Sequence, residues 1–264
     1  MKQLFFLLIS TLSLISVFAQ KGFHAGVNVG VNSTWIFNQN NYGYSEMDYE
    51  LKFGANPGLA AGYNFTNNYG VELGLCYAML GQNYFDRIRD FGPIDPVTGK
   101  PDKVETFRYI KLNYLQVPIL FRYQTTKEKK DKIEFHAMLG PSVGVLLSAD
   151  QYYEADIDGN GSVEELDPNF VPQTAIEEFA LTTEDEVSKD YFSSLDVGIQ
   201  LDLGVDIYVS EMMYVTPALK LYGAFTDLNS EATRISEGYS ASRNGFVGIS
   251  VGIHYIKIEK DKKD

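Results

Sequence analysis

The sequence predicts an all-β protein: an eight-stranded antiparallel up-and-down transmembrane β-barrel with four long external loops. Three observations predict it, namely a strict two-residue alternation over 195–209, a similar alternation in seven other segments, and connections that alternate between short and long. In 195–209 every odd position is aliphatic, whereas the even positions carry three aspartates, a glutamine, two glycines and a tyrosine. Because side chains alternate faces along a strand, this segment is typical of a strand between lipid and a polar lumen.

The N-terminus has the features of a secretory signal peptide. Lys2 supplies the positive charge, residues 4–18 form the apolar core, and Ala19 ends a small-residue cleavage site. The apolar run is shorter than the roughly 20 residues that a membrane helix needs. We therefore expect residues 1–19 to be removed on export, and residues 20–264 to form one outer-membrane β-barrel domain.

The overall composition narrows the class of partners. The formal charge is −13 and Cys76 is the single cysteine. An acidic chain is a poor partner for nucleic acid, and one cysteine excludes an internal disulfide framework. Only helices and closed barrels can span lipid, so a chain without a second long apolar segment is either a soluble exported protein or a barrel.

The alternation locates the strands and the connections between them. We expect strands at 23–35, 51–65, 69–85, 104–123, 132–148, 191–209, 213–227 and 244–258. The short connections are 66–68, 124–131 and 210–212, and the long ones are 36–50, 86–103, 149–190 and 228–243. Short periplasmic turns and long external loops are the outer-membrane pattern, which a soluble barrel does not need.

The parity of the strands assigns side chains to the two faces. Outward aromatic residues next to the short turns predict an interfacial girdle of Phe65, Tyr69, Phe121, Tyr123, Phe135 and Tyr255. The opposite rim offers only Trp35 and Phe225. The expected polar lumen contains Asn28, Asn64, Glu72, Gln116, Arg122, Glu134, His136, Asp196, Gln200, Asp202, Asp206, Lys220 and His254. Arg122 and Lys220 are expected to anchor hydrogen-bonded networks that fill the lumen, because small barrels fill their interiors with side chains.

Three segments resemble a known family, the PorT-like outer-membrane β-barrel proteins of Bacteroidetes. They are the signal peptide end at 18–20, the glycine-rich strand 25–30 and the segment 114–123, which reads YLQVPILFRY. The resemblance implies the barrel fold and a cell outer membrane location. Members of the family differ in role, and one branch is linked to protein secretion, so the resemblance implies little about function.

The loop 149–190 contains a calcium-loop pattern. It holds thirteen acidic residues and one lysine, a local charge of −12. Within it, oxygen ligands at loop positions 1, 3, 5, 7, 9 and 12, with glycine at position 6, resemble EF-hand and dockerin loops. The expected Ca2+ ligands are Asp156, Asp158, Asn160, Ser162 through its carbonyl, Glu164 through water, and Asp167. Aspartate at position 12 followed by Pro168 departs from the EF-hand pattern, and the alternative is a solvated acidic turn.

Three functions remain open at this stage. The leading hypothesis is a non-enzymatic, monomeric barrel in contact with outer-membrane lipid, whose external loops bind an envelope or extracellular protein. The second is a small-solute or ion channel, which the charged lumen suggests. The third is a lipid-modifying enzyme, which we disfavour because His24, His136 and His254 lie at the periplasmic side and no Gly-x-Ser-x-Gly motif is present.

Overall fold

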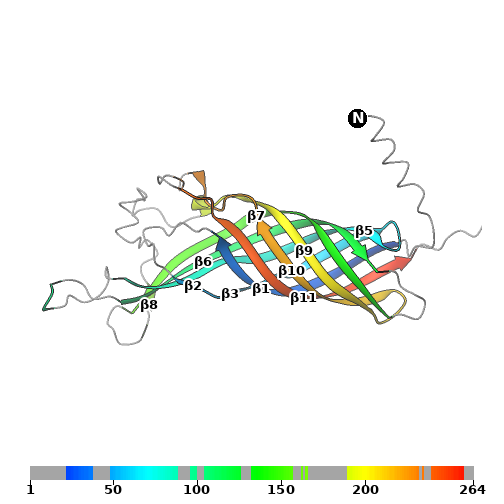
Figure 1. Ribbon diagram of the computed structural model, residues 1–264, viewed down its shortest axis with the longest axis horizontal. Coiled ribbons are helices and arrows are strands. Elements are labelled where there is room, and N and C mark those ends of the chain that lie inside the picture. Colours follow the sequence, from blue (N-terminus) through cyan, green and yellow to red (C-terminus); the bar gives the residue numbers. More distant parts are fainter. Residues whose placement is uncertain are drawn as a thin grey trace, which may run out of the picture.

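Long antiparallel strands dominate the computed structural model (Figure 1). It describes residues 22–37, 48–88, 96–99, 104–125, 132–156, 162, 164–165, 189–231, 234 and 239–258. The elements are β1 (Gly22–Phe37), β2 (Asp48–Glu50), β3 (Lys52–Ala55), β4 (Gly58–Asn64), β5 (Tyr69–Ile88), β6 (Val104–Gln124), β7 (Ile133–Ala155), β8 (Glu164–Glu165), a 3-10 helix η1 (Lys189–Tyr191), β9 (Leu195–Tyr208), β10 (Met213–Ala224) and β11 (Arg243–Ile258). Within these residues no helix is long and apolar enough to cross a membrane.

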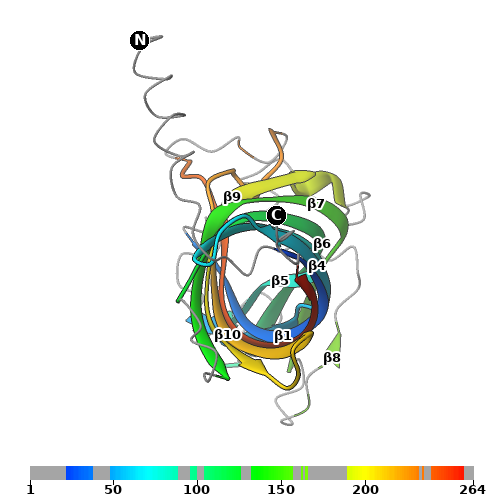
Figure 2. The same cartoon turned by 90° about the vertical axis from the view of Figure 1, so that its right-hand side faces the viewer.

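The strands close into a barrel. The order is β11-β10-β9-β7-β6-β5-β4-β1-β3, and β11 also pairs with β1 from Gly22↔Ile258 to Phe37↔Arg243. Because β3 and β4 both lie along β1, the described strands occupy eight positions around the ring. Figure 2 looks along the barrel and shows the ring closed. Closure leaves no unpaired edge in the lipid, which confirms the predicted fold class.

The two ends of the barrel differ. One end carries the turns at 65–69 and 209–213, closed by hydrogen bonds such as Phe65 N to Tyr69 O at 3.1 Å and Val209 N to Met213 O at 3.0 Å. We call it the turn end. At the opposite end, the loop end, β5, β6 and β7 run on beyond the other long strands, and β8 lies beside β7 (Figure 1).

The second predicted strand is interrupted. Asn56 and Pro57 separate β3 from β4, although the register with β1 continues from Val31↔Ala55 to Asn28↔Gly58. Gly30 and Asn56 exchange two backbone hydrogen bonds of 3.1 and 2.9 Å, so the chain stays in line. The interruption follows from Pro57, which has no N–H to donate to the ladder.

Two predicted boundaries are wrong by four residues or more. The strand predicted at 132–148 continues to Ala155, so the first residues of the predicted loop 149–190 are strand. They pair with an equally long β6, from Asn113↔Ser148 to Thr106↔Ala155, and this partner satisfies their backbone groups. The strand predicted at 191–209 begins only at Leu195, because η1 and a bridge from Phe192 to Asn229 precede it.

The alternation between lipid face and lumen is confirmed in the membrane band. On β9, Leu203 is 42% exposed and the adjacent Asp202 is 2% exposed. All six residues of the predicted girdle are exposed at the turn end, and four of their rings cluster, with the centroid of Tyr69 5.7 Å from that of Phe121 and 5.6 Å from that of Tyr123, and the centroid of Phe65 6.4 Å from that of Phe121. Burying charge in hydrocarbon is costly, so this parity fixes which face meets lipid.

Candidate functional site

Arg122 organises the turn-end half of the lumen. Its guanidinium, on β6, forms an ion pair with Asp206 of β9 and lies 3.6 Å from Glu72 Oε2 of β5. Its Nε also donates to Gln124 Oε1 at 2.8 Å. All four side chains are buried, and a buried ion pair is tolerated only when such additional partners satisfy both charges. The predicted role of Arg122 as an anchor is confirmed.

Histidine, threonine and tyrosine side chains extend this network. His24 Nε2 lies 3.1 Å from Glu72 Oε2, and Thr216 donates to Asp206 Oδ1 at 2.7 Å. His136 Nδ1 lies 3.1 Å from the same Asp206 oxygen, within ion-pair distance, but the angle is not that of a hydrogen bond. The His254 ring stacks on Tyr214 with centroids 4.9 Å apart. The three histidines thus lie in the turn-end half, as predicted.

A second cation completes the polar half of the lumen. Lys220 Nζ on β10 lies 3.7 Å from Asp202 Oδ2, and Gln200 donates to Asp202 Oδ1 at 2.8 Å. Between this group and Arg122 remains a cavity of about 20 Å³. Such a volume holds about one water molecule. The side chains therefore fill this half of the lumen rather than line a channel.

The loop-end half of the lumen contains a large apolar cluster, which the sequence analysis missed. A buried cluster there contains Ile36, Ala78, Leu80, Tyr84, Ile110, Leu112, Tyr114, Leu146, Ala149, Phe192, Tyr222, Ala224, Leu228 and Phe246. A signal for it existed in β6, where the alternation inverts: Ile110 and Leu112 are buried while Lys111 is exposed. This apolar layer fills the lumen at a second level, beyond the charged layer around Arg122.

The base of the last long connection is held by Asp227. Its carboxylate accepts hydrogen bonds from Tyr239 Oη at 2.8 and 2.7 Å and from Ser242 N at 3.1 Å, and lies 3.0 Å from Arg234 Nε. Desolvation, together with the hydrogen bond to Asp227, raises the pKa of Tyr239 above its usual value of 10.0. The tyrosine therefore stays a donor below pH 10, and the contact weakens only as the pH rises through the raised pKa.

The structure places the backbone at the start of the predicted calcium loop beside the backbone of its ninth residue, Glu164. Asp156 follows β7 directly and its N–H donates to Glu105 O at 3.1 Å. Glu164 is in β8, whose pairing Ala155↔Glu164 joins the two ends of the segment between them. Ser162 is exposed. The other expected ligands, Asp158, Asn160 and Asp167, lie outside the described residues.

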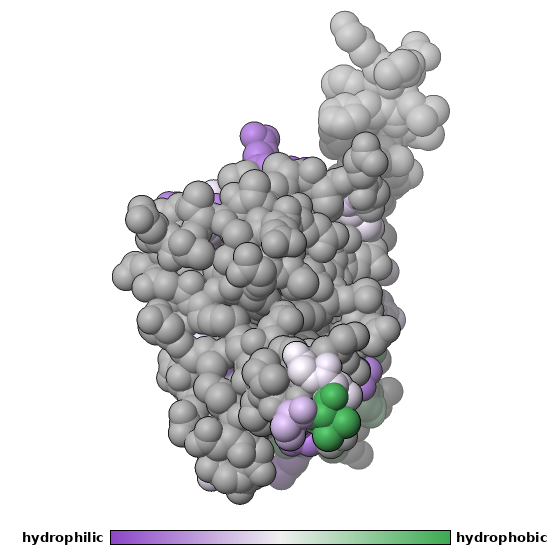
Figure 3. All heavy atoms as spheres, turned by 90° about the vertical axis from the view of Figure 1, so that its left-hand side faces the viewer, coloured by the Kyte–Doolittle hydropathy of each residue, from purple (hydrophilic) through white to green (hydrophobic). Residues whose placement is uncertain are grey.

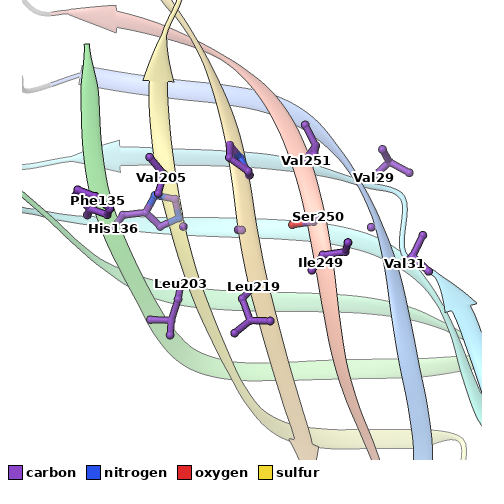
Figure 4. A pocket seen from close by; sticks show the side chains of 14 residues that line it. Val29, Val31, Phe135, His136, Leu203, Val205, Leu219, Ile249, Ser250 and Val251 are labelled. Carbon is purple, nitrogen blue, oxygen red and sulfur yellow. The ribbon is translucent and has the colours of Figure 1, made fainter. Parts of the chain in front are cut away.

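A hollow of about 740 Å³ lies on the outer wall across β7, β9, β10, β11 and β1 (Figure 4). Exposed aliphatic residues of the lipid face border it, among them Val31, Leu203, Leu219 and Ile249. Beneath it runs a row of small inward residues paired across the strands, Gly30, Ser250, Ala218 and Gly204. Its apolar lining and its place in the membrane band assign it to the lipid-facing surface.

A closed antiparallel sheet with an apolar exterior and a polar lumen layer defines a β-barrel membrane protein. The family model described as outer membrane protein beta-barrel domain matches residues 18–230. The chain therefore belongs to this family, and it is a protein of the outer membrane.

Solved structures of other outer-membrane barrels are similar in fold at low identity. OprG from Pseudomonas aeruginosa is 12% identical, with 91% of this chain and 98% of that chain covered and a TM-score of 0.41. Neisserial surface protein A is 12% identical, with 88% and 96% covered and a TM-score of 0.39. Ail of Yersinia pestis is 9% identical over 88% and 97% of the two chains, with a TM-score of 0.31. No curated protein matches the sequence. Likeness of this degree carries no argument about function.

Proposed function

We propose that this protein is a non-enzymatic, monomeric outer-membrane barrel that does not conduct and that presents its loop end to a protein partner outside the cell. One observation carries the proposal: two layers of side chains fill the lumen, the charged layer around Arg122 and the apolar layer around Phe246. A filled barrel is a rigid support, and loops on a rigid support are the usual place for recognition. The motif 114–123, which lies in β6, supports the PorT-like branch for this chain.

Conductance in planar lipid bilayers separates this proposal from the channel alternative. The full-length barrel should be silent, because neither layer leaves a continuous aqueous path. The double variant Arg122→Ala with Phe246→Ala removes one large side chain from each layer and should produce openings. Steady openings of the unmodified protein that vanish in Arg122→Ala would establish a channel and overturn the proposal.

Partner binding is tested on intact envelopes. A photocrosslinking residue at the exposed position Val97 should capture an external protein, whereas the same residue at Asn67 in the turn should not. Capture from the turn position alone would mean that the partner is periplasmic and that the orientation is the reverse of the one proposed.

We also propose that the segment 156–167 binds Ca2+. The pairing of β7 with β8 supports it, because it closes the segment into a loop that starts at Asp156. An extracellular loop of this kind is expected to bind in the range of about 0.1–1 mM.

Calorimetry and limited proteolysis of the full-length protein test the ion site. Calcium should protect the segment from protease and leave barrel unfolding nearly unchanged, since the strands close without it. Asp156→Ala with Asp158→Ala should abolish the protection, and Asp150→Ala, an exposed carboxylate on β7 outside the loop, should not. Magnesium should substitute poorly because it demands octahedral geometry. If calorimetry detects no heat of binding at millimolar calcium, the proposal is wrong and the motif is only an acidic turn.

A further inference from the structure

The outer face of the barrel changes character at a polar row on β6 and β7. The outward aliphatic run ends at Leu115 and Leu147, and the next outward side chains are polar, with Asn113 Nδ2 donating to Ser148 Oγ at 2.9 Å. A register shift lies in the same place, between Asn113 and Tyr114. Beyond it the polarity of the two faces of β6 is reversed, with Ile110 and Leu112 inside and Lys111 exposed outside. Charged side chains avoid hydrocarbon, so this row marks the limit of the lipid band.

Aromatic rings reappear on the outer face beyond that limit. Phe85 of β5, Phe107 and Tyr109 of β6, and Tyr152 of β7 form a continuous set, which we call the aromatic ledge. Ring centroids are 5.0 Å apart for Phe85 and Phe107, 6.4 Å for Phe107 and Tyr109, and 4.9 Å for Tyr109 and Tyr152. All four side chains are half-buried. The ledge was missed in the sequence, which assigned this rim only Trp35 and Phe225.

The ledge lies at the water-facing end of the molecule. Figure 3 looks onto this end, where few described residues are in view and most of those are hydrophilic. Lipid does not account for these rings, because the outward charged pair Lys111 and Asp150 separates them from the lipid band. Exposed aromatic clusters in water mark interaction sites, and tyrosine is enriched among the residues that carry binding energy.

The surrounding charges select the partner. Asp150 and Glu154 flank the ledge on β7, and Glu154 hydrogen-bonds the hydroxyl of Tyr109. A ring face already accepts a cation here, because Lys111 Nζ lies 4.5 Å from the centroid of Tyr152 and makes no ion pair with Asp150, its cross-strand neighbour, among the described contacts.

We propose that the aromatic ledge docks a cationic, arginine-bearing segment of a partner protein. The inference rests on the proposed function and names the chemistry of its partner. Arginine is the cation most often found over tyrosine rings, since its flat guanidinium stacks on them. The carboxylates attract the segment over distance, and the ring faces hold it at contact.

Binding of a deca-arginine peptide to the refolded full-length protein in nanodiscs tests the ledge, with a deca-citrulline peptide as the neutral control. The unmodified barrel should bind only the cationic peptide. Tyr109→Leu with Tyr152→Leu keeps the apolar bulk, removes two ring faces, and should weaken binding about five- to thirty-fold. Tyr255→Leu, a change at an exposed tyrosine of the turn end, should change nothing.

A variant that gains affinity for deca-arginine tests the ledge more directly than a variant that loses it. Lys111→Met removes the cation that lies over Tyr152 and should strengthen binding of deca-arginine more in the protein that keeps both tyrosines than in the double tyrosine variant, a difference that the loss of one surface charge alone would not give. Equal binding to the unmodified protein and to the double tyrosine variant would overturn the ledge proposal, because the acidic segment alone would then hold the peptide. Binding of dextran in place of the peptide would also overturn it, in favour of a glycan. Neither outcome affects the crosslinking test of the proposed function.

Discussion

Replacing Arg122 by methionine should strongly destabilise the barrel. The change keeps the length of the side chain and removes the one guanidinium that contacts both Asp206 and Glu72. Those carboxylates are 0% and 8% exposed, so each is left as a buried charge without this partner. Breaking a buried pair in this way costs about 3–5 kcal/mol. Lys111→Met removes an exposed cation from the same strand and should cost within about 0.5 kcal/mol.

Urea titration of the full-length protein in phospholipid vesicles measures both losses. The fluorescence of Trp35, the single tryptophan, reports unfolding, and the gel shift of the folded barrel confirms the midpoint. Adding Asp206→Asn and Glu72→Gln to Arg122→Met should recover part of the stability, because no uncompensated charge remains. A loss below about 1 kcal/mol for Arg122→Met, or a triple variant no better than the single one, would refute the network as a stabilising core.

Two further predictions concern the lipid face and the orientation. Leu203→Arg places a charge in the lipid band and should cost about 2–4 kcal/mol, whereas Val209→Arg, on the same face at the turn end, should cost about 0–1 kcal/mol in the same titration; equal losses would contradict the assigned membrane band. In a Cys76→Ala background, a cysteine at Gly99 should react with an impermeant maleimide on whole cells and one at Asn67 should not. The reverse labelling pattern would place the loop end in the periplasm.

The sequence by itself determined the fold class, because period-two alternation is a local property of each strand. Parity alone assigned Leu203 to lipid and Asp202 to the lumen, and the structure agrees. It also picked out Arg122 and Lys220 as anchors, since cations that are outnumbered by inward carboxylates have few other roles. The partner of each charge, such as Asp206 for Arg122, needed the register between strands, which no single strand encodes.

Only the tertiary structure decided the lengths of the strands and the arrangement of side chains at the loop end. The strand β7 reaches Ala155 because β6 is there to pair with it, and this length depends on the neighbour rather than on local propensity. The apolar layer around Phe246 gathers residues from strands far apart in the sequence, so no single segment reveals it. The aromatic ledge arises in the same way, since Tyr109 and Tyr152 stack only because the register of β6 and β7 sets them opposite each other.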